Sequence, residues 1–234
     1  MPIQIIPSES RGLTKTDWLT SYHSFNFAEY YDPSRTGFGK LRVLNDDVIA
    51  PGAGFPAHAH GNMEIITFVL SGALEHKDST GGQGVIKEGQ MQRMTAGKGI
   101  QHSEFNASKS QPVHILQIWI TPRDKGLEPE YEQKDFSDLL SPDNWNVVVA
   151  PQKSPTALFI HQDVRFLLGL LDEETSLTHV FSSPDKGGYC FLIDGEVEVD
   201  GKTLGARDAA IITGQKQFEL KALKPSFCLL IETG

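Results

Sequence analysis

The sequence predicts an all-β protein that consists of two small barrels in tandem. Its 234 residues include 22 glycines and 13 prolines, which provide turns between many short elements. Apolar runs of strand length follow one another between clusters of glycine, proline, asparagine and aspartate. The second half of the chain repeats the punctuation of the first at similar length, which indicates an internal duplication.

Strands are expected throughout the first half from residue 41 onward. Residues 65–70 are apolar on both faces, as in a strand that lies between two packed sheets. Turn-forming clusters at residues 51–54 and 78–82 separate this run from its neighbours. The other strands expected in this half are residues 41–49, 73–77 and 113–120.

The second half begins after a charged segment at residues 122–133, which contains two prolines and a glycine and is expected to form a crossover or linker. A short helical turn is expected at residues 139–146, and Asp-Gly pairs predict turns at residues 194–195 and 200–201. The strands expected here are residues 158–161, 166–171, 189–193, 196–199, 209–213 and 226–232. The N-terminal barrel is therefore assigned to residues 1–136 and the C-terminal barrel to residues 137–234, and terminal segments could exchange strands between them.

Composition excludes several classes of function. The net charge of −9 argues against direct nucleic-acid binding, because the chain would repel a polyanion. No run of about 18 apolar residues occurs and residues 1–11 do not resemble a signal peptide, so no membrane span is expected. The two cysteines, Cys190 and Cys228, lie in apolar runs and are expected to be buried free thiols. The absence of a disulfide framework favours a cytoplasmic location.

Two pairs of residues carry the chemistry that the sequence predicts. His58 and His60 are two residues apart on an extended segment, so their side chains project from the same face. His102 and Glu104 repeat this spacing about 40 residues later, and three imidazoles with one carboxylate form a suitable set for a divalent metal ion. By the same alternation, Glu64 also faces the side of His58 and His60 if its strand stays regular.

The remaining histidines lack such a pattern. His161 and Asp163 share the spacing of two, so a second metal site is conceivable there, but no second pair follows them and structural roles are expected. Structural roles are likewise expected for His23, His76, His114 and His179. The aromatic residues Phe25, Phe27, Tyr30 and Tyr31 are expected to pack in the core or between the barrels rather than to contact substrate.

These residues also carry a resemblance. Gly52-x5-His58-x-His60-x3-Glu64 resembles the first cupin motif, and His102-x3-Asn106, preceded by Gly89, resembles the second. More specific matches between about residues 11 and 136 resemble the pirin family. They are Trp18, His23-Ser-Phe-Asn-Phe, Tyr31-Asp-Pro, Leu41-Arg-Val-Leu-Asn-Asp-Asp, Asn62-Met-Glu-Ile-Ile-Thr, Ala96-Gly, Gly99-Ile-Gln-His-Ser-Glu and Gln117-Ile-Trp.

The resemblance implies a fold and a ligand set. Pirins are bicupins with a metal ion, usually iron, in the N-terminal barrel only, and their ligands fall on His58, His60, His102 and Glu104 of this sequence. A typical cupin uses the glutamate of the first motif, here Glu64. Because the pirin carboxylate comes from the second motif, Glu104 is the preferred ligand and Glu64 is expected to support the site. The expected cofactor is one Fe(II) ion, with Mn, Ni, Cu, Co or Zn as alternatives.

The resemblance also implies two functions. Pirin-like bacterial proteins include quercetin 2,3-dioxygenases, which suggests a small aromatic or enolic substrate, O2 as the second substrate and Glu104 as the catalytic base. The alternative is an iron-dependent redox-sensing regulator that binds a transcription factor or a metabolic enzyme as its protein partner. A zinc-dependent hydrolytic or structural site is a third alternative. The protein is expected to be a monomer.

Overall fold

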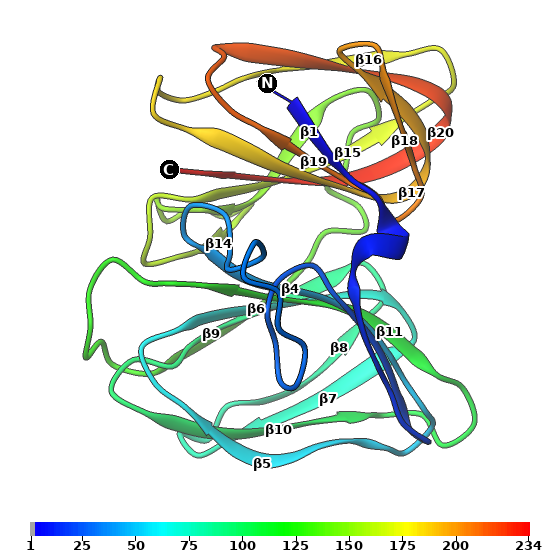
Figure 1. The fold of residues 1–234 in the computed structure, drawn as a ribbon. Coiled ribbons are helices and arrows are strands. Elements are labelled where there is room, and N and C mark those ends of the chain that lie inside the picture. The colour runs from blue at the N-terminus through cyan, green and yellow to red at the C-terminus, as the bar shows by residue number, and fades with distance from the viewer. Residues whose placement is uncertain (1–2) are drawn as a thin grey trace. The chain divides into compact units, whose positions relative to one another are not determined.

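The computed structural model describes residues 3–234, and Figure 1 shows that the chain is built from β-strands. One short 3-10 turn, η1 (Ser8–Ser10), is the only helical element among the described residues, so the all-β prediction is confirmed. No helix in that part of the chain is long and apolar enough to cross a membrane. The chain divides into two compact units. We call the unit of residues 11–138 and 158–162 the first barrel, and the rest of the chain the second barrel.

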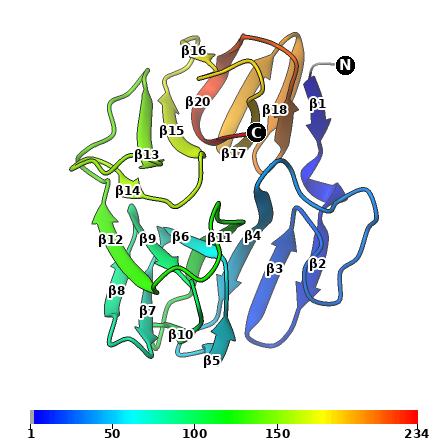
Figure 2. The same cartoon turned by 90° about the vertical axis from the view of Figure 1, so that its left-hand side faces the viewer.

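The first barrel contains two sheets. The larger has seven strands in the order β12-β9-β6-β11-β4-β3-β2, and Figure 2 shows β2, β3 and β4 side by side at one edge. Its strands are β2 (Gly12–Lys15), β3 (Leu19–His23), β4 (Leu41–Ile49), β6 (Glu64–Ser71), β9 (Gln90–Thr95), β11 (Val113–Ile120) and β12 (Glu130–Asp135). The smaller sheet has the order β5-β10-β7-β8. Its strands are β5 (Gly54–His60), β7 (Ala73–Asp78), β8 (Gln83–Lys87) and β10 (Ile100–Asn106). The two-residue strand β14 (Leu158–Phe159) also belongs to this unit.

Aliphatic side chains from both sheets form the core of this barrel. Leu74 of β7 and Ile86 of β8 are fully buried against Val69 of β6 and Ile115 of β11. Burial of each such side chain stabilises the fold by about 1.5–3 kcal/mol. The core therefore holds the small sheet, which carries the candidate metal ligands, firmly against the large one.

The second barrel is also made of antiparallel strands, in the order β1-β19-β17-β20-β15-β13, with β18 paired to β17 and β16 to β20. These strands are β1 (Ile3–Ile6), β13 (Trp145–Ala150), β15 (Arg165–Leu171), β16 (Ser176–Val180), β17 (Gly187–Val199), β18 (Lys202–Gly205), β19 (Ala209–Ile212) and β20 (Gln217–Thr233). Cys190 and Cys228 are buried and free in its core, which confirms the prediction for the thiols.

Three local predictions are wrong. Residues 130–133 lie in strand β12 rather than in a linker, because β12 pairs with β9 along its whole length. Residues 139–146 form turns and the start of β13 instead of a helical turn. The chain does not turn at Asp194-Gly195, since β17 continues through this pair by register shifts against β20. The hairpin turn lies at Asp200-Gly201, between β17 and β18, as predicted.

Candidate metal centre

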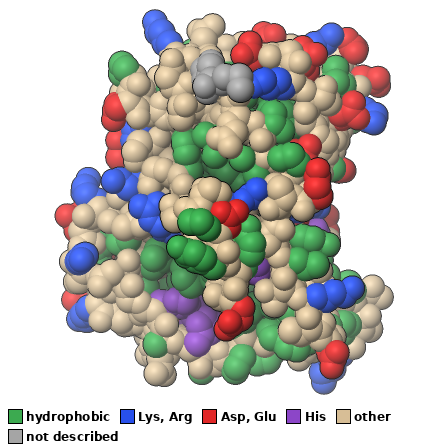
Figure 3. All heavy atoms as spheres, in the orientation of Figure 1, with side chains coloured by type: hydrophobic (Ala, Val, Ile, Leu, Met, Phe, Trp, Pro, Cys, Tyr) green, Lys and Arg blue, Asp and Glu red, His purple; other side chains and the backbone are tan. Residues whose placement is uncertain are grey.

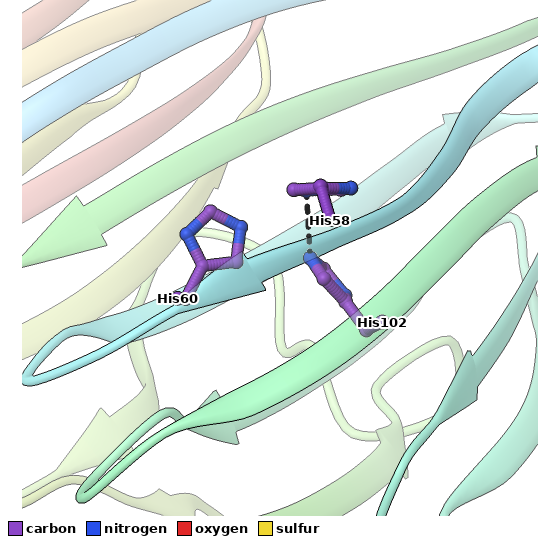
Figure 4. Close-up of side chains that lie close together, drawn as sticks. All are labelled: His58, His60 and His102. Carbon is purple, nitrogen blue, oxygen red and sulfur yellow. Dashed lines mark hydrogen bonds between the residues drawn. The ribbon is translucent and has the colours of Figure 1, made fainter.

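The candidate site lies on the paired strands β5 and β10 of the first barrel. His102 of β10 stands directly opposite His58 of β5, and His60 is opposite Ile100. A register shift between His102 and Glu104 then changes the pairing along β10. Alternation along β5 places His58 and His60 on one face, so the pairing brings three imidazoles together. Figure 4 shows the three rings of His58, His60 and His102 gathered above the two strands.

The spacing of these imidazoles suits a metal ion. The Nε2 atoms of His58 and His102 are 3.1 Å apart, and one ligand nitrogen from each of the three histidines lies within 4.8 Å of the others. Two imidazole nitrogens that bind one ion at about 2.1 Å and at right angles are separated by about 3.0 Å. His58 Nδ1 lies 2.8 Å from the carbonyl oxygen of Pro56 and donates its hydrogen there, which leaves Nε2 as the free lone pair.

The surroundings of the site keep the imidazoles of His60 and His102 neutral. Burial lowers the pKa of His60 to about 4, and electrostatic repulsion from His58 adds a smaller effect in the same direction. Burial also lowers the pKa of His102 to about 3, and electrostatic repulsion from His58 and His60 adds to this effect. Neutral imidazole is the form that binds metals, so both rings are ready to act as ligands near pH 7 without losing a proton.

Glu104 is buried beside His102 and is held by three donors. Gln92 Nε2 and Thr67 Oγ1 lie 2.6 and 3.1 Å from its Oε1, and Gln117 Nε2 lies 2.7 Å from its Oε2. Burial raises the pKa of this carboxyl, against the opposing effect of His76 and of the hydrogen bonds. Because a carboxylate can accept about four hydrogen bonds, Oε2 retains a lone pair for a metal ion or a proton. Glu104 groups with His76 and His102 rather than with the full set of three histidines.

Glu64, the alternative carboxylate, has different partners. Its Oε2 accepts hydrogen bonds from Thr95 Oγ1 at 3.1 Å and from the backbone N–H of His161 at 3.4 Å. Burial raises its pKa, and the charge of Arg93 opposes this effect. Among the described residues, Glu104 and not Glu64 joins a group of metal-ligand type.

His76 joins Glu104 and His102 in this group, although a structural role was predicted for it. It stands opposite Glu104 across the pairing of β7 with β10, and His102 stands opposite Asp78 in the same pairing. His76 Nδ1 is 3.5 Å from His102 Nδ1, and His76 Nε2 is 3.0 Å from Asp78 Oδ2. Burial alone would raise the pKa of Asp78, but hydrogen bonds from Thr80, His76 and Gly82 hold it below its usual value. Spacing along the chain could not reveal His76, because its partners come from a neighbouring strand.

A cavity opens beside the histidines. Its volume is about 180 Å³. His58, His60, His102 and Glu104 all line it. Figure 3 shows histidine side chains at the surface beside hydrophobic ones, in the lower part of the view where Figure 1 draws β5 and β10. The histidine group is therefore accessible to a ligand.

The cavity wall includes Phe27, an aromatic residue that was not expected to contact a ligand. Phe27 lines the cavity and packs edge-on against Trp119, with ring centroids 5.5 Å apart. Tyr31 is 75% exposed, so the prediction of a core position is wrong for both residues, whereas Phe25 is buried as predicted. Hydrophobicity alone does not distinguish a core position from a cavity wall.

The same wall contains the carboxyl group of Asp47, which is not among the proposed metal ligands. Asp47 is 2% exposed, and its Oδ1 has no hydrogen-bond partner. Burial raises the pKa of Asp47 to about 7, and the charges of Asp46 and Glu104 add to this effect against a hydrogen bond from Ser21.

The other histidines have structural partners, as predicted. His23 is buried and contacts Asn45 and Thr14, His114 contacts Asp46, and His179 contacts Glu232, all at hydrogen-bond distances. Neither His161 nor Asp163 belongs to a group of three or more metal-ligand side chains within residues 3–234.

Comparison with known proteins places this site in a family. The Pirin family model matches residues 7–120, and the model of the quercetinase C-terminal cupin domain matches residues 147–233. Quercetin 2,3-dioxygenase of Escherichia coli K12 is 36% identical over 231 residues, which are 98% of each chain. A pirin-like protein of Caulobacter vibrioides is 37% identical over 229 residues, or 97% of this chain and 98% of the relative.

Solved structures agree with these relatives. The crystal structure of YhhW from E. coli superposes with a TM-score of 0.95 at 35% identity and covers 99% of this chain and 97% of its own. The structure of the bacterial pirin YhhW in complex with nickel(II) gives a TM-score of 0.93 at 35% identity, with coverages of 99% and 98%. The chain therefore belongs to the pirin family, and its two barrels are cupin domains.

Proposed function

We propose that this protein is a metal-dependent dioxygenase that cleaves quercetin or a related flavonol with O2. The observation that carries the proposal is the group of three histidines, which lies in the wall of a cavity of about 180 Å³. The E. coli relative named quercetin 2,3-dioxygenase supports the same activity.

His58, His60, His102 and Glu104 would hold the ion. The three imidazoles have the required separations, and Glu104 lines the same cavity. Nitrogen and oxygen donors of this kind suit Fe(II), the metal that we propose, as well as nickel(II), which a relative binds. When bound, such an ion supplies Lewis acidity and a redox centre toward O2. The second barrel is proposed to hold no metal.

The cavity walls suit a flat aromatic substrate. Trp119, Phe27 and Phe55 provide aromatic surfaces, and Leu19 and Ile65 add aliphatic ones. Aromatic faces bind planar rings favourably and exclude water from them. A flavonol can lie between these walls with its hydroxyl and ketone oxygens directed toward the histidines.

Glu104 is proposed to take the proton from the substrate hydroxyl. Burial raises the pKa of its carboxyl, so the carboxylate is a stronger base than an exposed glutamate. Gln92 and Gln117 keep the carboxylate oriented while it accepts the proton. Loss of this proton makes the flavonol electron-rich, which favours its reaction with O2.

The test combines metal loading with turnover. Protein reconstituted with Fe(II) or Ni(II) is mixed with quercetin without O2, and O2 is then admitted while quercetin and released carbon monoxide are measured. We expect quercetin loss and carbon monoxide only after O2 is added, and neither with Glu104→Gln. His114→Gln, outside the cavity, should behave as wild type. A metal-loaded protein that leaves flavonols intact in air would contradict the proposal and favour a regulatory role.

A further inference from the structure

We propose that Asp78 and His76 fix the ring tautomer of His102 and so present the Nε2 lone pair of His102 to the metal ion. Asp78 and His76 are positioning residues in this proposal, since they act through His102. The inference rests on the proposed metal site. The tautomer of His102 can be measured in the metal-free protein and does not require turnover.

The first link is the pair of Asp78 and His76, whose side chains are both fully buried. Asp78 Oδ1 accepts hydrogen bonds from the backbone N–H and the hydroxyl of Thr80, at 2.8 and 2.6 Å, and from Gly82 N–H at 3.0 Å. These three donors orient the carboxylate, and its Oδ2 then lies 3.0 Å from His76 Nε2. An ionised carboxylate only accepts hydrogen bonds, so the hydrogen of His76 is on Nε2.

The second link joins the two histidines. A neutral imidazole has one N–H, so His76 with its hydrogen on Nε2 has an acceptor lone pair on Nδ1. That Nδ1 lies 3.5 Å from His102 Nδ1. A hydrogen can lie between the two nitrogens only if His102 is protonated on Nδ1. His102 Nε2 is then a bare lone pair, and it points toward His58 Nε2 at 3.1 Å.

The ring of His58, which faces His102, also has a fixed tautomer. His58 donates its Nδ1 hydrogen to the Pro56 carbonyl, so its Nε2 is also a bare lone pair. Two lone pairs that face each other at 3.1 Å repel, and a cation between them removes this repulsion. Both tautomers are thus those that a metal ion requires, and each is fixed by a partner on the far side of the ring.

The position of His76 favours this role over direct ligation. Its ring stacks on Tyr131, with centroids 4.5 Å apart and planes inclined by 20°. Its Nε2 is occupied by Asp78, and its Nδ1 faces Nδ1 of His102 rather than the Nε2 that faces His58. The stacking and the aspartate together oppose a rotation that would bring His76 to the ion.

Asp78→Asn tests the proposal, because the three donors at Oδ1 would keep the amide oxygen there and leave the amide NH2 facing His76. His76 must then accept at Nε2 and carry its hydrogen on Nδ1, which drives the hydrogen of His102 to Nε2. We expect 15N NMR of the metal-free protein to show His102 protonated on Nδ1 in wild type and on Nε2 in the variant. The Kd for Ni(II), measured by chelator competition, should rise about 10–100-fold.

Two further variants separate this effect from general damage. Asp46→Asn alters another aspartate–histidine pair of the same barrel, Asp46 with His114, and should change neither the His102 tautomer nor the Kd. His76→Phe keeps an aromatic ring against Tyr131 but removes the acceptor, and should also raise the Kd. An unchanged His102 tautomer in Asp78→Asn, with a Kd within about threefold of wild type, would overturn the proposal. Failure to cleave quercetin with normal tautomers and normal Kd would count only against the proposed activity.

Discussion

His58 and His102 are 44 residues apart in the chain, yet their Nε2 atoms are separated by only 3.1 Å. The pairing of β5 with β10 produces this proximity, since the two residues stand directly opposite each other. His60 joins them through the alternation of β5.

Removal of either facing histidine should abolish metal retention. His58→Ala and His102→Ala each remove one of three imidazoles, and the remaining donors leave the ion more exposed to water and chelators. Elemental analysis of purified, reconstituted protein should give about one metal ion per chain for wild type and close to none for either variant. His161→Gln, which changes a histidine outside both ligand groups, should retain the wild-type metal content.

The two buried glutamates should differ in their effect on the metal. Glu104→Gln replaces the carboxylate that lines the cavity, and should raise the Kd for Ni(II) at least tenfold. Glu64→Gln changes a carboxylate that contacts Thr95 and the His161 backbone, and should keep the Kd within about threefold. Isothermal titration of both variants checks this pair. The reverse order would identify Glu64 as the ligand, as in a typical cupin.

Gly54 should be required for the close approach of β5 to β10. A Cβ at this position would lie 2.2 Å from the backbone oxygen of Glu104 and 2.5 Å from Cα of Phe105, so the strands would have to separate. Gly54→Ala should lower the free energy of unfolding by about 1–3 kcal/mol and weaken metal binding. Urea unfolding and nickel titration measure the two effects.

Gly61 offers the matched control for that substitution. It follows His60 directly, and a Cβ there would meet nothing nearer than the Gly97 carbonyl at 4.0 Å. Gly61→Ala should therefore change the free energy of unfolding by no more than about 0.5 kcal/mol. Equal losses in both variants would show that the spacing of β5 and β10 is not what Gly54 provides.

Asp47 should make the metal-free protein less stable as the pH rises. The pKa of Asp47 is about 7 in the folded protein and about 3.8 in the unfolded chain, so between these values the folded state holds more protons. The free energy of unfolding is therefore not reduced by Asp47 below about pH 4, and it decreases as the pH rises from about 4 to about 7. Asp47→Asn cannot ionise, and its advantage over wild type should grow from near zero at pH 4 to at most about 4 kcal/mol at pH 8.

Urea unfolding of the two proteins at both pH values measures this difference. Asp124→Asn, which changes an exposed aspartate with a 56% exposed side chain, serves as the control and should show no such trend. An advantage of Asp47→Asn that is equal at pH 4 and pH 8 would contradict the assignment.

Much of the fold could be predicted from the sequence where the local signals agreed with the packing. The expected strands at residues 41–49 and 113–120 coincide with β4 and β11, because both segments contain β-branched and other apolar residues and are bounded by turn-forming residues. The turn predicted at Asp194-Gly195 was wrong. This pair is typical of a turn, but it lies inside β17, where register shifts accommodate it. Residues 130–133 also misled, because their charged side chains fit an edge strand as well as a linker.

The candidate site shows a similar division. Spacing of two residues indicated His58, His60 and the pair of His102 and Glu104, since alternation along a strand is a local property. The same alternation also allowed Glu64, and the preference for Glu104 came from the resemblance to pirins. His76 could not be found in this way, because its relation to Glu104 and His102 depends on the register of β7 against β10. The cavity position of Phe27 likewise depends on which side chains face it, and no periodic pattern encodes that.

The position of a bound metal ion would identify its ligands directly. A crystal of the nickel-loaded protein, measured at the nickel absorption edge, locates the ion by its anomalous scattering. We expect a single peak in the first barrel within about 2.2 Å of nitrogen atoms of His58, His60 and His102 and of a carboxylate oxygen of Glu104. A peak coordinated by His76 or by Glu64 in place of Glu104, or no peak at these histidines, would contradict this expectation.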